Sequence, residues 1–295
     1  MQADLKKAKK FLSNKVSSQI SNEGIHWLDQ VIDDLETKPV NHSFFIAFSI
    51  APRFTGKEKL LISENDMEEA DCIRKGWYIN DLTMDRAVRL LLILNAYNGN
   101  ISDHKNILNK LLYSGDLREL EALFSSLPLL PHPQEHCDMA LEGKRINMIS
   151  VFDRIALNNP FPADYLKEDS WNQMILKAVF IERPLYKIYG LNERVNIRLA
   201  SMLMDYVHER WAAGRTITPE LWRLISPFTD NTILRDIEKL FEQEPIHQLA
   251  AALVCSTSKL PRAKRLLASK PDVEQMIQEE NISWGTIGEK WFNKN

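Results

Sequence analysis

Apolar side chains recur along most of this chain at intervals of three and four residues, which is the period of an amphipathic α-helix. The run Leu90–Leu94 is apolar on every side, so it is expected inside the core. Two further segments, Val195–Tyr206 and Ile246–Val254, each carry one apolar stripe. We therefore predict that these three helices form the centre of the hydrophobic core.

Capping residues indicate where the helices begin. Ser63 with Asp66 and Asp116 with Glu119 have the spacing of capping boxes, and Pro219 suits the first turn of a helix. The predicted helices span residues 3–20, 23–36, 42–50, 64–74, 84–98, 103–113, 117–127, 134–143, 145–158, 168–183, 192–213, 219–226, 230–243, 246–257, 261–269 and 272–279.

The short connections between these helices favour an all-α fold, with antiparallel helical hairpins in a layered or irregular solenoid-like (HEAT-like) array. Ten glycines in 295 residues are too few for a strand-rich fold with many tight turns. We predict a single domain over residues 1–295, with two layers joined near the proline-rich residues 128–133.

Charge and cysteine content exclude several classes of function. A formal net charge of −3 gives no positive field for nucleic acid. Cys72, Cys137 and Cys255 are odd in number and far apart, which predicts neither a disulfide framework nor a zinc site and fits a reducing cytoplasm. Common hydrolase and nucleotide-binding motifs are absent from the sequence, so we predict no cofactor and no catalytic residue. The segment HPQEHCD, residues 132–138, is a weak alternative for metal, because Pro133 keeps its two histidines off one helix face.

The sequence contains no export signal and no run of about 18 apolar residues, the length that spans a bilayer, so we expect a soluble cytoplasmic protein. The predicted helix 3–20 has one apolar face surrounded by lysines. Such a helix either docks on its own domain or rests on an anionic membrane surface. Peripheral contact with the inner membrane through residues 3–20 is therefore an open alternative.

Residues 142–180 are the first candidate binding region, because polar side chains interrupt otherwise apolar helices there. On the predicted helix 145–158, Asn147, Arg154 and Asn158 lie on one narrow polar stripe. A cation among apolar neighbours needs carboxylates, carbonyls, water or an anionic ligand to answer it. Alternatively, the arginine reaches water along its apolar stem.

The following helix carries a second polar stripe. Lys177 is the sole charge within residues 174–181, and Asp169 and Gln173 precede it at intervals of four. If the two stripes face each other, they form a polar pocket. The internal partners considered for the two cations are Asp153, Asp164, Asp169 and Glu182.

Three residues beside these stripes have a structural alternative as well as a binding role. Asn159, like Asn158, precedes a proline segment, where asparagine commonly satisfies the backbone of a turn. Trp171 and Asn172 open the next helix and offer an aromatic plane beside an amide, although core packing is the commoner role of a tryptophan.

A second candidate region is residues 208–223, where arginines alternate with tryptophans and can hold an anion in a bidentate fork. Its alternative is a helix end at which arginines answer the free carbonyls and tryptophans fill a helix junction. The residues of this cluster are His208, Arg210, Trp211, Arg215, Trp222 and Arg223. A third candidate is APRFTGK, residues 51–57, where Arg53 and Lys57 flank a turn and either capture an anion or remain solvated.

The same three blocks resemble the EboA family: APRFTGK, then EGKRINMISVFDRIALNNPFPADYLKEDSWNQMILKAVF, then DYVHERWAAGRTITPELWRLISPF. The resemblance covers about residues 23–285. The first 20 residues and the HPQEHCD segment carry no part of it.

The resemblance implies a bacterial protein whose operon also encodes a UbiA-like prenyltransferase, a TatD-like hydrolase, a sugar-phosphate isomerase-like protein and a dehydroquinate-synthase-like protein. Such operons are associated with processing secondary-metabolite precursors and moving them toward the periplasm. The resemblance carries over no catalytic residue.

Three hypotheses follow from the sequence. The first is a non-catalytic accessory protein that binds a small anionic or amphipathic metabolite, or a partner, in a polar groove between helices. The second is a scaffold that recruits the membrane prenyltransferase and other operon products through an exposed apolar surface. The third is an enzyme that uses His208 or Lys177 as an acid or base.

Overall fold

A computed structural model describes residues 2–294 and confirms the all-helical prediction. Across these residues there is no β-strand, only one isolated bridge between Lys59 and Thr83. The chain divides into two compact units, residues 1–167 and 168–295, which we call unit 1 and unit 2. The division falls just after the NNPFP segment and not at residues 128–133. A single continuous domain stays a prediction.

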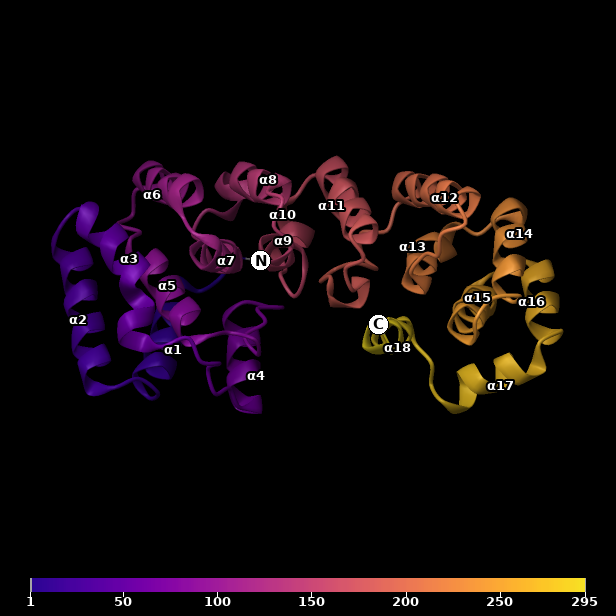
Figure 1. The fold of residues 1–295 in the computed structure, drawn as a ribbon, viewed down its shortest axis with the longest axis horizontal. Coiled ribbons are helices and arrows are strands. Elements are labelled where there is room, and N and C mark those ends of the chain that lie inside the picture. The colour runs from indigo at the N-terminus through magenta and orange to yellow at the C-terminus, as the bar shows by residue number, and fades with distance from the viewer. Residues whose placement is uncertain (1, 295) are drawn as a thin grey trace. The chain divides into compact units, whose positions relative to one another are not determined.

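Among the described residues, unit 1 is built from ten α-helices and two 3-10 turns. Figure 1 labels its helices α1 to α10. Their bounds are α1 (Leu5–Ser17), α2 (Asn22–Thr37), α3 (His42–Thr55), α4 (Glu64–Ile73), α5 (Met84–Asn95), α6 (Ile101–Ser114), α7 (Leu117–Ser125), η1 (Leu127–Leu129), η2 (Pro133–His136), α8 (Cys137–Arg145), α9 (Ile149–Ala156) and α10 (Phe161–Tyr165).

The centre of unit 1 is α5, as predicted, because α1, α3 and α7 all pack against it. Every residue from Met84 to Leu94 is buried. Among them are three charged residues that the apolar pattern did not predict inside a core. Asp85 accepts hydrogen bonds from Arg89 at 2.9 Å and from Arg118 at 2.7 and 3.0 Å, so the buried carboxylate is paired.

The first helix docks on its own unit. Its apolar residues Ala8, Phe11, Leu12 and Val16 are buried, and α1 packs against α5 and α4. The apolar face that a membrane-surface helix would insert is therefore already covered. Among the described residues, no helix combines the length and apolarity that a bilayer-spanning segment needs.

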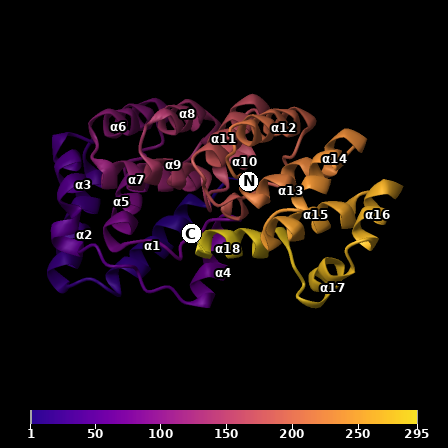
Figure 2. The ribbon, with the colours of Figure 1, turned by 45° about the vertical axis from the view of Figure 1, so that its right-hand side comes forward.

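The described part of unit 2 contains eight α-helices and three 3-10 turns. Figure 2 labels its helices α11 to α18. Their bounds are α11 (Glu168–Phe180), η3 (Leu185–Lys187), α12 (Ile197–Ala212), η4 (Pro219–Leu221), α13 (Trp222–Ile225), η5 (Ser226–Phe228), α14 (Asn231–Leu240), α15 (Pro245–Thr257), α16 (Pro261–Ala268), α17 (Pro271–Glu279) and α18 (Trp284–Lys294).

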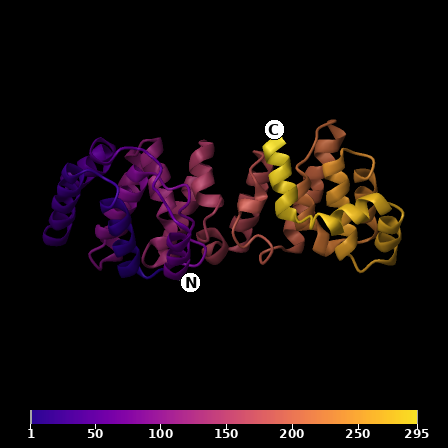
Figure 3. The same cartoon turned by 90° about the horizontal axis from the view of Figure 1, so that it is seen from below.

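The predicted apolar helix α15 is the core element of unit 2, and α13, α14, α16, α17 and α18 pack around it. The last helix, α18, was not predicted from the sequence. It lies against α15, η3 and η4, and Figure 3 shows it in yellow alongside the other elements of unit 2. Its first residue, Trp284, lines the candidate site described below.

Two predicted helices differ from the structure for local reasons. The predicted helix 145–158 is shorter, because Asn158 adopts a left-handed backbone with φ of 52° and ends α9 before Pro160. Asn147 and Asn158 therefore lie outside α9. The predicted helix 219–226 is a 3-10 turn followed by the short α13 and a second 3-10 turn.

Candidate functional site

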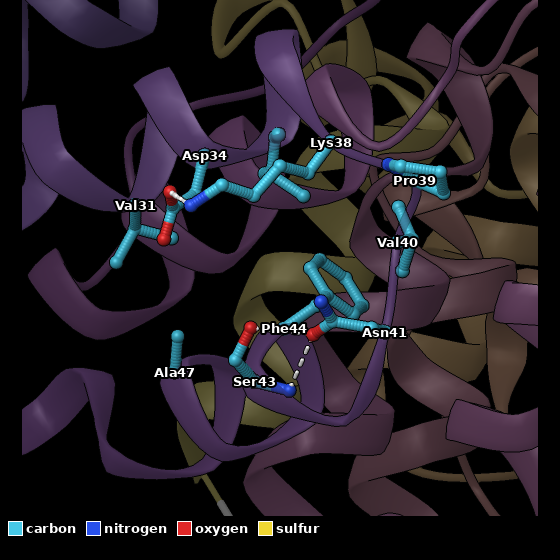
Figure 4. Close-up of a pocket in the computed structure, with 10 residues that line it drawn as sticks. Val31, Asp34, Lys38, Pro39, Val40, Asn41, Ser43, Phe44 and Ala47 are labelled. Carbon is cyan, nitrogen blue, oxygen red and sulfur yellow. Dashed lines mark hydrogen bonds and ion pairs between the residues drawn. The ribbon is translucent and has the colours of Figure 1, made fainter.

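Three concavities within the units differ mainly in size. The one between α2 and α3 holds about 60 Å³ and is rimmed by the Asp34–Lys38 ion pair and the Asn41 cap of α3 (Figure 4). It has room for water but not for a metabolite, which commonly needs about 300–1,000 Å³. Unit 2 has two larger grooves of about 530 and 610 Å³.

We call the larger groove the Arg223 groove. It lies between the loop before α12, the α13–η5 turn, the end of α15 and the start of α18. Its polar and aromatic lining includes Asn192, Arg223, Ser226, Thr257, Lys259 and Trp284. The smaller groove, between α15, α16 and α17, has a mixed lining in which Leu253, Leu267 and Ile277 lie with Lys264 and Glu274.

Arg223 is the central charge of this groove. The neighbouring Trp222 is fully buried and fixes α13, so that Arg223 emerges half-buried at the groove wall. Its Nε donates a hydrogen bond to Oδ1 of Asn192 at 2.5 Å. No described residue accepts a hydrogen bond from its two terminal nitrogens, and no described carboxylate forms an ion pair with it. Burial lowers the pKa of Arg223, but an arginine stays charged at neutral pH.

The lining of the groove also carries hydroxyl groups and a second cation. Ser226 and Thr257 share a hydrogen bond of 3.0 Å between their hydroxyl oxygens, which ties the α13–η5 turn to the end of α15. Lys259 follows this helix end and is exposed. Trp284 supplies an aromatic surface at the first residue of α18. The groove thus combines positive charge, hydroxyl groups and apolar surface.

The nearest buried acid does not neutralise Arg223 at pH 7. Glu220 is fully buried in η4, three residues before Arg223. Burial raises the pKa of the Glu220 carboxyl to about 8, against the lowering effects of Arg223 and of the Leu185 and Tyr186 backbone amides. At neutral pH Glu220 is therefore largely uncharged, and the Arg223 charge remains available to an anion.

Arg154 forms an ion pair within unit 1. Its Nη1 donates to the Asp81 carboxylate, which also lies 3.8 Å from Nη1 of Arg86. Asp81 was not among the partners predicted from the sequence. Arg154 belongs to unit 1 and Lys177 to unit 2, so the pocket predicted between them stays a prediction.

The three predicted asparagines near α9 lie either in solvent or in the turn that follows the helix. Asn147 is exposed in the loop before α9, and Asn158 is half-buried in its left-handed turn. Asn159 is buried, donates to the carbonyl of Arg154 at 2.7 Å and accepts from the amide of Phe161 at 2.9 Å. Its amide group is thus used by the turn, which is the structural alternative considered for it.

In α11, the predicted residues lie in different surroundings. Trp171 is fully buried, with the Arg194 guanidinium 4.8 Å from its ring centroid. Asn172 exchanges two hydrogen bonds, of 3.1 and 2.9 Å, with the side chain of Asn196, the residue that caps α12. Lys177 is half-buried, and burial lowers the pKa of its ammonium group. Core packing and helix docking therefore account for Trp171 and Asn172.

The cluster at the end of α12 forms a helix junction. Arg210, in the last turn of α12, donates to the carbonyl of Thr216 in the following loop at 3.2 and 2.9 Å, and not to the free carbonyls of the helix end that the sequence suggested. Trp211 lies 5.9 Å from Trp222, ring centroid to ring centroid. Exposed His208 bonds to Asp236 through Nε2 at 2.8 Å. Arg215, Arg53 and Lys57 are all exposed.

Sequence reasoning included Arg223 in the second cluster but did not select it as a site residue. Its signal was the pair Trp222–Arg223, which places a cation beside a buried aromatic anchor. Asn192, Lys259 and Trp284 gave no such signal, because they lie in loops or at a helix start. Among the described residues, no group of three or more histidines, cysteines or acids is arranged to hold a metal ion.

Comparison with known proteins identifies one family. The family model described as "Metabolite traffic protein EboA" matches residues 8–226 of the chain. The match begins within α1 and ends at Ser226, the first residue of η5. It therefore includes part of the first 20 residues and the HPQEHCD segment, which the resemblance was expected to leave out. No curated protein and no solved structure matches the chain.

Proposed function

Because this chain belongs to the EboA family of metabolite traffic proteins, we propose that it holds a small anionic metabolite in the Arg223 groove without changing it chemically. The observation that carries the proposal is the state of Arg223. Its Nε is fixed by Asn192, while its terminal nitrogens have no protein hydrogen-bond partner among the described residues. A guanidinium held in this way is preorganised to bind a carboxylate or phosphate through two parallel hydrogen bonds.

The shape and lining of the groove support an amphipathic ligand. Its volume of about 610 Å³ suits a metabolite with an anionic head and an apolar body. Val195, Leu260 and Trp284 offer apolar surface beside the cations. Prenyl phosphates and aromatic carboxylates combine both properties and are the ligand classes we propose.

Thermal-shift titration with prenyl phosphates and aromatic carboxylates tests the proposal. The ligand should raise the melting temperature of the wild-type protein, since binding to the folded state stabilises it. Arg223→Gln should weaken affinity by at least about tenfold, the value of one charge-assisted hydrogen bond. Exposed Arg215→Gln is the matched control and should bind like wild type. Equal affinity of both variants would remove Arg223 as the anchor.

The scaffold hypothesis remains a second proposal, supported by large apolar side chains on the surface. Tyr113 is 80% exposed in unit 1, and Phe180 is 70% exposed in unit 2. A UbiA-like membrane prenyltransferase is the partner proposed for such surfaces. Co-purification that survives Arg223→Gln but not Phe180→Ser would favour the scaffold over ligand binding.

The acid–base proposal rests on the His208–Asp236 pair and predicts turnover that His208→Gln abolishes.

A further inference from the structure

The buried carboxyl group of Glu220 lies three residues before Arg223 in the chain. Glu220 has no exposed surface. Its Oε2 accepts a hydrogen bond from the amide of Leu185 at 3.1 Å, whereas its buried Oε1 has no hydrogen-bond partner among the described groups. Ionising a buried carboxyl group is costly when one of its oxygens accepts no hydrogen bond. The protonation state of Glu220 is therefore sensitive to nearby charges.

Helix α18 keeps water away from this acid. A Cβ atom on Gly288 would lie 2.4 Å from Cδ of Glu220 and 2.5 Å from Cδ1 of Tyr186. The helix backbone therefore rests directly on the carboxyl group. Only glycine allows this approach, because a larger residue would displace either α18 or Glu220.

The elements that pack on η4 are α13, α15, α18 and η3, and these elements carry the charged and titratable side chains around Glu220. Arg223 of α13 favours its ionised form, and Glu193 also acts on Arg223. Lys187 of η3 and Glu289 and Lys290 of α18 are exposed, and Lys290 pairs with Glu280 at 3.0 Å. From α15, buried His247 contacts Trp291 of α18, and burial lowers the pKa of its ring. Arg223 is therefore the one charge named here that both acts on Glu220 and lines the groove.

Arg223 is thus shared between the ligand and Glu220. When Glu220 carries its proton, the positive charge of Arg223 is free to attract an anion. When Glu220 ionises, a buried negative charge three residues away weakens that attraction in a poorly screened environment. An anion on Arg223 has the reciprocal effect and holds the proton on Glu220.

We propose that the Arg223 groove binds its anionic ligand together with a proton on Glu220, so that ligand affinity falls as Glu220 ionises. This inference rests on the proposed function and adds a means of release to it. The proton comes from the solvent and returns there when the ligand leaves.

Sulfate is a suitable probe, because it remains a dianion throughout the range that titrates Glu220. Isothermal titration calorimetry of the wild-type protein from pH 6.5 to 9.5 should show affinity up to about tenfold weaker at pH 9 than at pH 7, the largest change over this range for one linked proton whose pKa in the free protein is about 8. Glu220→Gln should bind with a nearly constant affinity over the same range. Parallel pH profiles of the two proteins would overturn the inference.

A second measurement needs no variant. At pH 8, the apparent binding enthalpy of sulfate should differ between phosphate-free buffers of high and low ionisation enthalpy, because binding takes up a proton. Identical enthalpies would overturn the inference while leaving the proposed function intact. Absence of sulfate binding at every pH, or undiminished binding by Arg223→Gln, would instead reject the proposed site and the inference with it.

Discussion

The guanidinium of Arg154 donates a hydrogen bond to the carboxylate of Asp81, which lies 73 positions earlier in the chain. This ion pair joins α9 to the loop before α5, and Arg86 of α5 approaches the same carboxylate. Arg154 was chosen from the sequence because a cation among apolar residues needs a counter-ion. The counter-ion is a protein group in unit 1.

Removing this carboxylate should destabilise the protein modestly. Arg154 and Asp81 keep 25% and 47% of their side-chain surface exposed, so water screens their interaction. We expect Asp81→Asn to lower the free energy of unfolding by about 1 kcal/mol in urea denaturation. Exposed Asp29→Asn in the middle of α2, for which no ion pair is found among the described residues, is the control and should have no measurable effect. Equal stability of the two variants would contradict a structural role of the pair.

The buried Asp85 should matter much more. Burial raises the pKa of the Asp85 carboxyl. Hydrogen bonds from Arg118 and Thr83 and the charges of Arg118 and Arg89 lower it by more, so the net effect is a lowered pKa. Asp85→Asn leaves Arg89 in the core without its countercharge and should reduce the free energy of unfolding by about 3–5 kcal/mol. Because the folded-state pKa is depressed, this contribution is present above about pH 4 and is lost as pH falls through the lower folded value. Urea denaturation at pH 7 and pH 3 would measure it, and a loss equal to that of Asp81→Asn would contradict the account.

Unit 1 should lose stability in mild acid because of two buried histidines. Burial lowers the pKa of His104 and of His136 to about 4, whereas the unfolded value is 6.5. Between these values the unfolded chain binds protons that the folded chain cannot, so stability falls as pH drops from 6.5 to 4. Each histidine contributes up to about 3 kcal/mol to this fall.

Replacing both histidines tests that slope. His104→Gln with His136→Gln should make the free energy of unfolding less dependent on pH between 6.5 and 4 than in wild type. The exposed His26→Gln is the control and should keep the wild-type slope. Unchanged slopes in all three proteins would show that the buried rings do not control acid stability.

Two glycines of α18 give a matched test of its docking. A Cβ on Gly288 would clash with Glu220 and Tyr186, whereas a Cβ on Gly285 would meet only Ser283 Oγ at 3.6 Å, an ordinary contact. Gly288→Ala should therefore destabilise unit 2 by about 1–3 kcal/mol, the usual range for overpacking. Gly285→Ala should be neutral or slightly stabilising, because alanine favours helix. Differential scanning calorimetry that found the reverse order would show that α18 does not rest on Glu220.

The sequence predicted most helices, because their apolar periods and caps are local signals. The Ser63 and Asp116 capping boxes are both present, and α5 and α15 occupy the predicted cores. It did not predict how Arg154 is paired, since Asp81 becomes its neighbour only through tertiary packing. Lys259 and Trp284, likewise, are brought beside Arg223 by the docking of α15 and α18, and neither position carries a periodic pattern.

The most direct test of the central claim is a crystal structure of the protein grown with selenate, whose anomalous scattering locates a bound oxyanion. The account predicts an anomalous peak in the groove, with selenate oxygens about 3 Å from the terminal nitrogens of Arg223. A groove without selenate, in which the Arg223 guanidinium is instead paired with a protein carboxylate, would contradict it.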